Sequence, residues 1–268
     1  MASSLFARLQ GWPQSISTHP LIQNHSTALV TLAALSGPLL RLIYISHADY
    51  RAWLRVGRGG LPYNAFGWLI QLLLTPLRGP RLDTGCYDNP KAVAKAGPQA
   101  LVSYLEEEDV PERQGPRPSI CHWLLPQRQL DSRSSEESKT RRESFMRSLA
   151  EADPTRLSVN TSALERGGLA LFVNLDVEKH PSARWTKNEI AHLHPGDGSM
   201  HVSLAPLDAK LVIERGWGER FGLGGTLLPA TYIMVYAPKS GENEEAETVV
   251  IEKIINAGMK FMLGERKE

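Results

Sequence analysis

The segment Glu189–Trp217 reads EIAHLHPGDGSMHVSLAPLDAKLVIERGW and decides both the fold and the position of a candidate site. It holds His192, His194 and His201, out of eight histidines in the whole chain. Successive side chains of a β-strand point to opposite faces of the sheet. His192 and His194 are therefore predicted to share one face of a strand.

The residues between these histidines favour a hairpin. Pro195-Gly196-Asp197-Gly198 combines the residue types that are typical of a tight turn. We expect residues 188–194 and 201–204 to form the two antiparallel strands that this turn joins. His201 then arrives on the strand next to His192 and His194.

Three roles for these histidines remain open at this level. An H-x-H pair on a strand is a common metal-ligand spacing, and His201 would supply a third imidazole for a divalent metal. Without a metal, the same rings would act as acid, base or substrate-binding groups, with Asp197 orienting one of them. A structural role is the third reading, in which His192 and His194 bind the turn by hydrogen bonds. The catalytic candidates are therefore His192, His194, His201 and Asp197.

Two neighbouring polar residues have narrower roles. Glu189 has the opposite parity to His192 and His194, so it would need a bulge or a strand end to join them. It is better explained as a structural carboxylate. Ser199 lacks the G-x-S-x-G elbow that exposes a nucleophile, and we place it among the substrate-binding candidates.

The turn that follows, Gly216-Trp217-Gly218-Glu219-Arg220, offers an indole, a carboxylate and a guanidinium. These side chains either wall a substrate pocket, with Trp217, Glu219 and Arg220 as binding residues, or form a capped turn whose indole fills the core.

The surrounding pattern indicates an α+β fold. The alternating segment 157–166 and the denser apolar run 168–177 predict two further strands, and residues 231–238 predict another. Helical patterns cover residues 206–215 and 244–263. Strands grouped before helices predict a mainly antiparallel sheet with helices packed on one face, in a domain spanning residues 157–268.

Residues 86–156 have a helical and polar character and are predicted to form a linker region. Its segment 131–142 lacks aromatic residues, and we expect it to be exposed ahead of a helix at residues 143–151.

The N-terminal part predicts a membrane-associated helical segment. Residues 27–46 are apolar over about the 20 residues that a bilayer requires, and are predicted to form a transmembrane helix. Arginines follow this run, which places the C-terminal domain in the cytosol by the positive-inside rule. Residues 1–26 would form a lumenal tail that is glycosylated on Asn24. These features predict a single-pass membrane protein of the endoplasmic reticulum.

Residues 47–85 are predicted to lie at the membrane interface. The apolar run Ala65–Leu77 is too short to span, and aromatic residues and arginines flank it. A buried core helix is the alternative, because length alone does not separate the two cases.

Composition excludes several classes of protein. A hydrophobic content of 42% over 268 residues supports a core, and a net charge of +1 gives no overall footprint for nucleic acid. Cys86 and Cys121 are the only cysteines, too few for a disulfide framework or a thiol metal site.

Three motifs resemble the fungal proteins known as luciferase domain-containing, over roughly Tyr50–Leu263. They are WLRVGRGGLPYNAFGWL, the histidine segment continued through GWGER, and YIMVYAPK. These proteins often accompany genes of secondary-metabolite or mycotoxin biosynthesis. Relatives tend to carry histidine and proline after the tryptophan turn, where this chain has Phe221 and Gly222. A histidine there is therefore not essential in this chain.

Together these features predict a membrane-anchored protein of fungal secondary metabolism. The leading hypothesis is a proton-transfer or cyclisation step on an apolar small molecule, without a cofactor. The alternatives are a non-catalytic scaffold for other enzymes of the pathway, and an oxygenase or hydrolase with a divalent metal at His192, His194 and His201. The expected partners are the small molecule, the membrane and pathway enzymes, with no nucleic acid.

Overall fold

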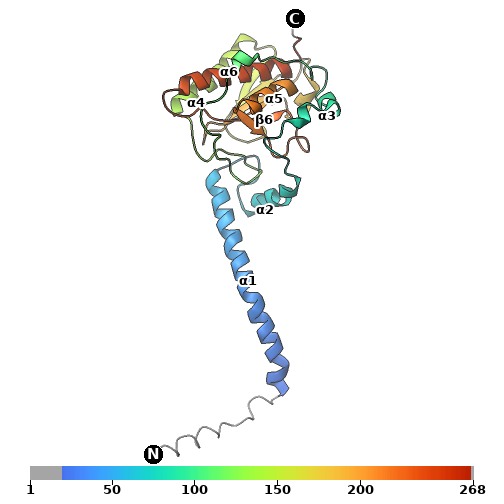
Figure 1. The fold of residues 1–268 in the computed structure, drawn as a ribbon, viewed down its shortest axis with the longest axis vertical. Coiled ribbons are helices and arrows are strands. Elements are labelled where there is room, and N and C mark those ends of the chain that lie inside the picture. Colours follow the sequence, from blue (N-terminus) through green and yellow to red (C-terminus); the bar gives the residue numbers. More distant parts are fainter. Residues whose placement is uncertain (1–19, 267–268) are drawn as a thin grey trace, which may run out of the picture. The chain divides into compact units, whose positions relative to one another are not determined.

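A computed structural model of the chain describes residues 20–266, and within residues 20–33 only the side chain of Val30. The chain divides into two compact units, of which one ends at Ala52 and the other begins at Trp53. Helix α1 (Pro20–Val56) runs from the first unit into the second. The remaining helices and all the strands of the described residues belong to the second unit (Figure 1).

A six-stranded antiparallel sheet forms the centre of the second unit, in the order β1-β2-β3-β4-β6-β5. The predicted α+β class and the antiparallel sheet are confirmed. The short β5 was not predicted, because three residues are too few to show a period. The strands are β1 (Leu157–Thr161), β2 (Leu169–Val173), β3 (Glu189–Leu193), β4 (Met200–Ser203), β5 (Gly218–Arg220) and β6 (Tyr232–Val235).

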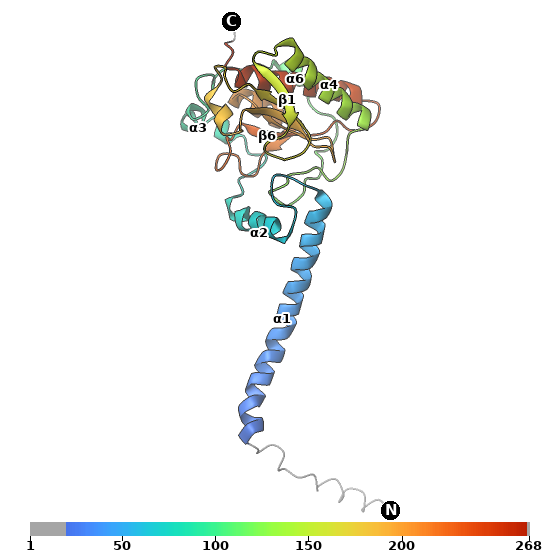
Figure 2. The same cartoon turned by 180° about the vertical axis from the view of Figure 1, so that it is seen from behind.

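Three helices pack on one face of this sheet (Figures 1 and 2). They are α4 (Glu136–Ala152), α5 (Pro206–Glu214) and α6 (Glu244–Met262). A single buried apolar cluster joins them to alternate strand residues such as Leu193, Val202 and Ile233. Since neighbouring strand residues point the other way, His192, His201 and Tyr232 face away from the helices. The helical layer thus leaves the opposite face of the sheet for polar residues.

Helix α4 begins at Glu136 rather than at the expected position 143, and it therefore includes half of the segment predicted to be exposed. Ser135 caps it, because its hydroxyl accepts a hydrogen bond from the Ser138 amide at 3.1 Å. Glu136 and Glu137 in the first turn add a favourable interaction with the helix dipole. Residues 136–142, which are polar and were predicted to be exposed, therefore form the first turns of α4. Several of their side chains are buried against the rest of the second unit.

Smaller elements surround the sheet. In α2 (Ala65–Leu74), Phe66, Leu69 and Leu73 are exposed whereas Gln71 is buried. The short helices are η3 (Thr75–Leu77), η4 (Gly85–Tyr87), α3 (Pro90–Ala94), η5 (Glu107–Asp109) and η6 (Pro181–Arg184).

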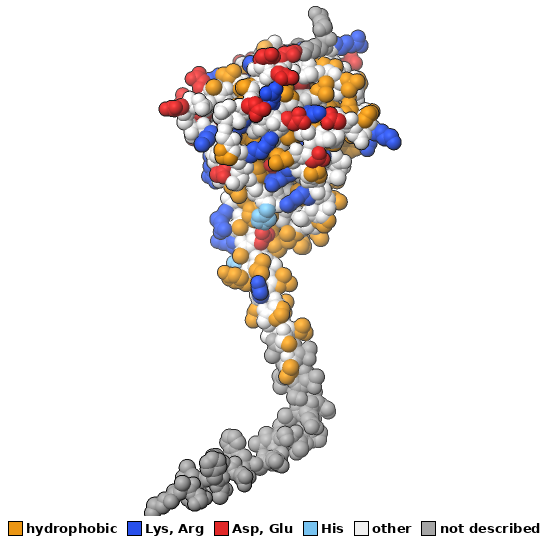
Figure 3. Space-filling view, viewed as in Figure 1, with side chains coloured by type: hydrophobic (Ala, Val, Ile, Leu, Met, Phe, Trp, Pro, Cys, Tyr) orange, Lys and Arg blue, Asp and Glu red, His pale blue; other side chains and the backbone are white. Residues whose placement is uncertain are grey.

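The surface charge of the second unit is mixed. On the face shown in Figure 3, acidic and basic side chains are interspersed, as expected for a net charge of +1.

The predicted single-pass membrane protein of the endoplasmic reticulum is wrong. Among the described residues, no helix is both long enough and apolar enough to cross a membrane. The described part of α1 contains Pro38, Arg41, Asp49 and Arg51, which interrupt or end its apolar run. Asn24, the predicted glycosylation site, lies outside the described side chains.

His180 gives the second unit a pH-dependent stability. Its Nδ1 accepts a hydrogen bond from the Ser182 amide at 3.1 Å, and its ring lies 4.2 Å from that of Phe261. Burial lowers the pKa of His180 from 6.5 to about 4. The unfolded chain therefore takes up the proton first, and stability falls as the pH drops from 6.5 towards 4.

We predict that His180→Asn, which keeps an acceptor for the cap but does not titrate, reduces this loss. Between pH 7 and pH 5 the unmodified chain should lose about 1–2 kcal/mol more unfolding free energy than the variant. Urea unfolding at the two pH values measures the difference. The contributions of the other buried histidines to the pH dependence are the same in both proteins, so they cancel in the difference. An equal loss in both would contradict the assignment.

Candidate functional site

The structure brings the three histidines of the predicted hairpin together. His192 on β3 and His201 on β4 are directly paired across the two strands. The ring centroids of His192 and His194 are 5.0 Å apart, and both rings lie 5.0–5.2 Å from that of His201. All three side chains are at most 1% exposed. The cluster is a buried group of imidazoles on the sheet face that the helices leave free.

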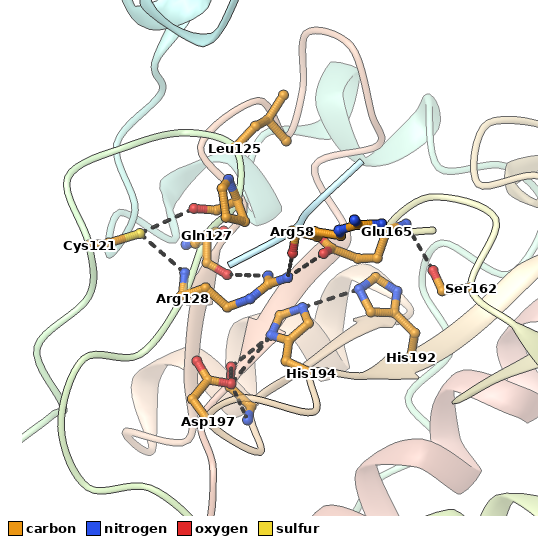
Figure 4. Close-up of polar contacts among 12 residues, drawn as sticks. Arg58, Cys121, Leu125, Gln127, Arg128, Ser162, Glu165, His192, His194 and Asp197 are labelled. Carbon is orange, nitrogen blue, oxygen red and sulfur yellow. Dashed lines mark hydrogen bonds and ion pairs between the residues drawn. The ribbon is translucent and has the colours of Figure 1, made fainter. Parts of the chain in front are cut away.

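Glu165 completes the cluster with a carboxylate that was not predicted. It comes from the loop between β1 and β2, and only 8% of the residue is exposed. One ligand atom from each of Glu165, His192, His194 and His201 lies within 4.8 Å of all the others. Figure 4 shows Glu165 beside His192 and His194.

Glu189 fixes the ring of His192. The register between β2 and β3 shifts at Leu171 and Phe172, which is a β-bulge. In a regular strand, Glu189 and His192 would point to opposite faces. With the bulge, the Glu189 carboxylate lies at Nδ1 of His192. The Glu189 carboxylate also accepts hydrogen bonds from the Ser162 hydroxyl at 3.0 Å and the Ala163 amide at 2.9 Å. Glu189 therefore positions a histidine and is not part of the ligand cluster.

Asp197 and Ser199 fix the ring of His194. The Ser199 hydroxyl donates to the Asp197 carboxylate at 2.9 Å and lies 2.8 Å from Nδ1 of His194. Since its single proton goes to the carboxylate, Ser199 accepts the proton of His194 Nδ1. The Asp197 carboxylate is held in turn by the amides of Gln129 at 2.6 Å and Ser199 at 3.1 Å.

The backbone fixes the ring of His201. Its Nδ1 lies 3.3 Å from the carbonyl oxygen of Ile233 on β6. A carbonyl only accepts, so this nitrogen carries the proton. With carboxylate, hydroxyl and carbonyl partners on their Nδ1 atoms, all three rings have Nε2 as the remaining ligand atom. Nε2 of His192 and Nε2 of His194 are 3.2 Å apart.

Arg128 borders the cluster and was also not predicted. Its guanidinium pairs with Glu165 and donates to the carbonyl oxygens of Arg58 at 2.8 Å and Gln127 at 2.9 Å (Figure 4). Burial, aided by this positive charge and by neighbouring histidines, lowers the pKa of His194 well below its usual range. Burial and the same kinds of charge lower the pKa of His201 in the same way. Both rings are therefore neutral at physiological pH.

Aromatic rings close the cluster on another side. Tyr232 stacks on His201 with ring centroids 4.8 Å apart and an angle of 14° between the planes. Phe221 meets His201 edge-on at 5.2 Å. Both belong to an apolar cluster with Leu124 and Leu223. Position 221 thus lies beside His201 and presents a phenyl ring to it.

Helix α4 holds the hairpin turn in place. The buried guanidinium of Arg142 donates to the carbonyl oxygen of Gly198 and, at 2.7 Å, to the Ser134 hydroxyl. The Lys139 ammonium donates to the carbonyl oxygen of Pro195 at 2.9 Å. Since Asp197 lies in this turn, α4 supports the residues that orient His194.

Trp217, Glu219 and Arg220 of the tryptophan turn have other partners than the clustered histidines. Trp217 belongs to the main core, and its indole nitrogen donates to the carbonyl oxygen of Pro111 at 2.6 Å. Glu219 pairs with Arg81 at 3.2 Å. Arg220 lines a separate cavity. Of the substrate-binding candidates, the structure brings only Ser199 into contact with a histidine of the cluster.

The comparisons with known proteins agree with the resemblance. Residues 187–255 match the family model described as the luciferase domain. A luciferase of Neonothopanus nambi is 29% identical over 97% of this chain and 92% of its own length. A luciferase of Armillaria mellea is 28% identical over 90% of each chain. No solved structure matches the chain.

The matched segment contains β3 and β4, and so all three clustered histidines. Glu165 and Arg128 lie outside it, but within the length shared with the fungal luciferases. The chain thus contains a segment that matches the luciferase domain, and it is similar to fungal luciferases over most of its length.

Proposed function

We propose that this chain is a metal-dependent oxidising enzyme, with a divalent transition metal held by His192, His194, His201 and Glu165. The observation that carries the proposal is the outward hydrogen bond on every Nδ1, which leaves three Nε2 lone pairs and a carboxylate in one buried space. Lone pairs that converge in this way repel one another unless a cation lies between them.

The spacing of the nitrogens supports this proposal. Two imidazole nitrogens at about 2.05 Å from one ion are separated by about 2.9 Å at a right angle and about 3.3 Å at a tetrahedral angle. The 3.2 Å between Nε2 of His192 and Nε2 of His194 lies within that range. Ligands on opposite sides of an ion lie about 4.1 Å apart, so a pair 4.8 Å apart would contract by about 0.7 Å in that arrangement and by about 1.5 Å in a tetrahedral one.

The electrostatics of the site support the same assignment. Metal ligation requires neutral imidazoles, and the lowered pKa values of His194 and His201 keep these rings neutral. Arg128 would oppose a nearby cation, but its charge is balanced by Glu165. Hydrogen-bonded partners such as Glu189 raise the basicity of a ligating histidine and fix its orientation.

The ligand types indicate which metals fit and what chemistry they offer. Imidazoles with one carboxylate suit iron, manganese, cobalt or zinc, and iron is the usual choice for reactions of dioxygen. A bound metal would supply an open position for dioxygen or substrate. Relatives named luciferase favour oxidation over hydrolysis, because luciferases are oxidising enzymes. The proposed reaction is oxidation of an apolar small organic molecule by dioxygen.

A second function, metal-free proton transfer, is favoured by one further observation. The side chains of Glu189, His192, His194, Ser199 and Asp197 form an unbroken sequence of hydrogen bonds. A proton shared between the two Nε2 atoms would then take the place of the metal. Under this alternative the same histidines act as acid and base.

Metal content separates these functions. We predict about one iron, manganese, cobalt or zinc ion per chain after reconstitution and gel filtration, and less than about a tenth of that in the folded double variant His192→Ala, His194→Ala. Elemental analysis measures the ratio. His47→Ala, which removes an exposed histidine outside the cluster, should keep the full content.

If the chain binds no stoichiometric metal, the proposed metal-dependent oxidation is wrong. In that case, if cells that carry the folded double variant no longer form the natural product, metal-free proton transfer is favoured. If those cells still form the full amount of product, both catalytic functions are excluded and a non-catalytic scaffold role remains.

A positioning role for Glu189 gives a second prediction. Glu189→Gln keeps the size and one acceptor but removes the charge that faces His192 Nδ1. We expect the affinity for Co²⁺, titrated by its visible absorption, to fall about 10–100-fold, as for other partners of ligating histidines. Glu178→Gln, at an exposed position, is the matched control. Unchanged Co²⁺ affinity in Glu189→Gln would remove its positioning role.

Oxidative chemistry requires that a diatomic molecule reach the metal. Nitric oxide is a stable substitute for dioxygen at ferrous sites. We predict that Fe²⁺-loaded protein under anaerobic conditions forms a ferrous nitrosyl complex, seen by its electron paramagnetic resonance signal, and that the double histidine variant gives none. A stoichiometric iron site that gives no such signal would count against oxidation.

A further inference from the structure

The second unit contains a cavity of about 540 Å³ that the histidine cluster does not use. Its walls come from α3, from η6 and from the loop between β5 and β6. Thr231 and Arg220 line it, whereas the next residue in each case, Tyr232 or Phe221, packs against His201. The described residues that line the cavity include none of the clustered residues His192, His194, His201 and Glu165. The cavity is a separate place for a ligand.

The charged residues of the cavity wall have one sign. Lys95, Arg184 and Arg220 line it, and none of its described lining residues is acidic. A cavity of about 300–1,000 Å³ is the usual size for a small-molecule site. Positive charge without a carboxylate partner in the wall favours an anionic ligand.

Arg220 is the residue that points most directly to such a ligand. It is only 7% exposed, and its Nε has no hydrogen-bond partner. Its other nitrogens make only long contacts, at 3.4 Å to the carbonyl oxygen of Asp83 and 3.3 Å to that of Gly224. A buried guanidinium is costly unless its donors are satisfied, and a planar carboxylate matches its geometry.

The rest of the wall is mainly apolar. Leu227, Leu228 and Pro229 line one part, and Ala92 of α3 and Ala96, which follows α3, line another. Trp185 adds an indole that is 55% exposed. These side chains suit the hydrocarbon body of a ligand whose acidic end reaches Arg220.

We propose that this cavity binds an apolar organic acid, with Arg220 holding its carboxylate. The proposal is independent of the metal site, since the cavity and its residues are distinct from the cluster. Of the residues in the tryptophan turn that were candidates for the wall of a pocket, Arg220 lines this cavity.

Two pairs of probes test the proposal by isothermal titration calorimetry on the full chain. Biphenyl-4-carboxylate and dodecanoate are the acids, and their neutral amides are the matched controls. We expect saturable binding of at least one acid, and binding about 10–100-fold weaker in Arg220→Met, because a charge-assisted pair is lost. The affinity for the neutral amide of that acid should differ by less than about threefold between Arg220→Met and the unmodified chain. Arg147→Met, on the exposed side of α4, should bind as the unmodified chain does.

A second variant keeps the test valid if Arg220→Met does not fold. Ala96→Phe fills the cavity without touching Arg220 and should abolish binding of acid and amide alike. No saturable binding of either acid, or unchanged acid binding in folded Arg220→Met or Ala96→Phe, would overturn the proposal. Metal content is unaffected by these outcomes, so the two proposals fail separately.

Discussion

The candidate site depends on the hydrogen bonds that hold each Nδ1 of the three histidines away from the centre of the cluster. Glu189 holds His192, Ser199 holds His194 and the backbone of β6 holds His201. Such a partner fixes the orientation of an imidazole and the nitrogen that carries its proton. Without these three bonds, the residues would still be close, but their Nε2 atoms would not share one space. Burial at 1% exposure or less then removes water as a competing partner.

Those hydrogen bonds depend on departures from regular structure. A bulge in the pairing of β2 and β3 turns Glu189 towards His192, and the hairpin turn places Asp197 behind Ser199. The turn is held by Arg142 of α4, whose buried guanidinium binds its backbone. Burial lowers the pKa of Arg142 to about 10, and the residue remains charged at neutral pH. The helical layer thus stabilises the core and also fixes the shape of the histidine hairpin.

The sequence was sufficient to predict what depends on local periodicity. The parity of His192 and His194, the turn after them and the neighbouring strand with His201 all follow from patterns of a few residues. The need for a bulge at Glu189 followed from the same parity. Glu165 and Arg128 were missed because loops far apart in the chain bring them to the cluster, and no spacing records that contact. The start of α4 was missed because its polar residues are buried by specific partners, whereas composition alone suggests exposure.

Phe221 shows how the cluster limits its own ligands. Its phenyl edge meets His201 at 5.2 Å, where a histidine would place a fourth imidazole. Phe221 offers no lone pair, and with Tyr232 it gives His201 an apolar border. The clustered residues come from β3, from β4, from the residue that follows β3 and from the loop before β2. Because a phenyl ring offers no lone pair, a metal bound as proposed would have only the three histidines and Glu165 of this cluster as ligands.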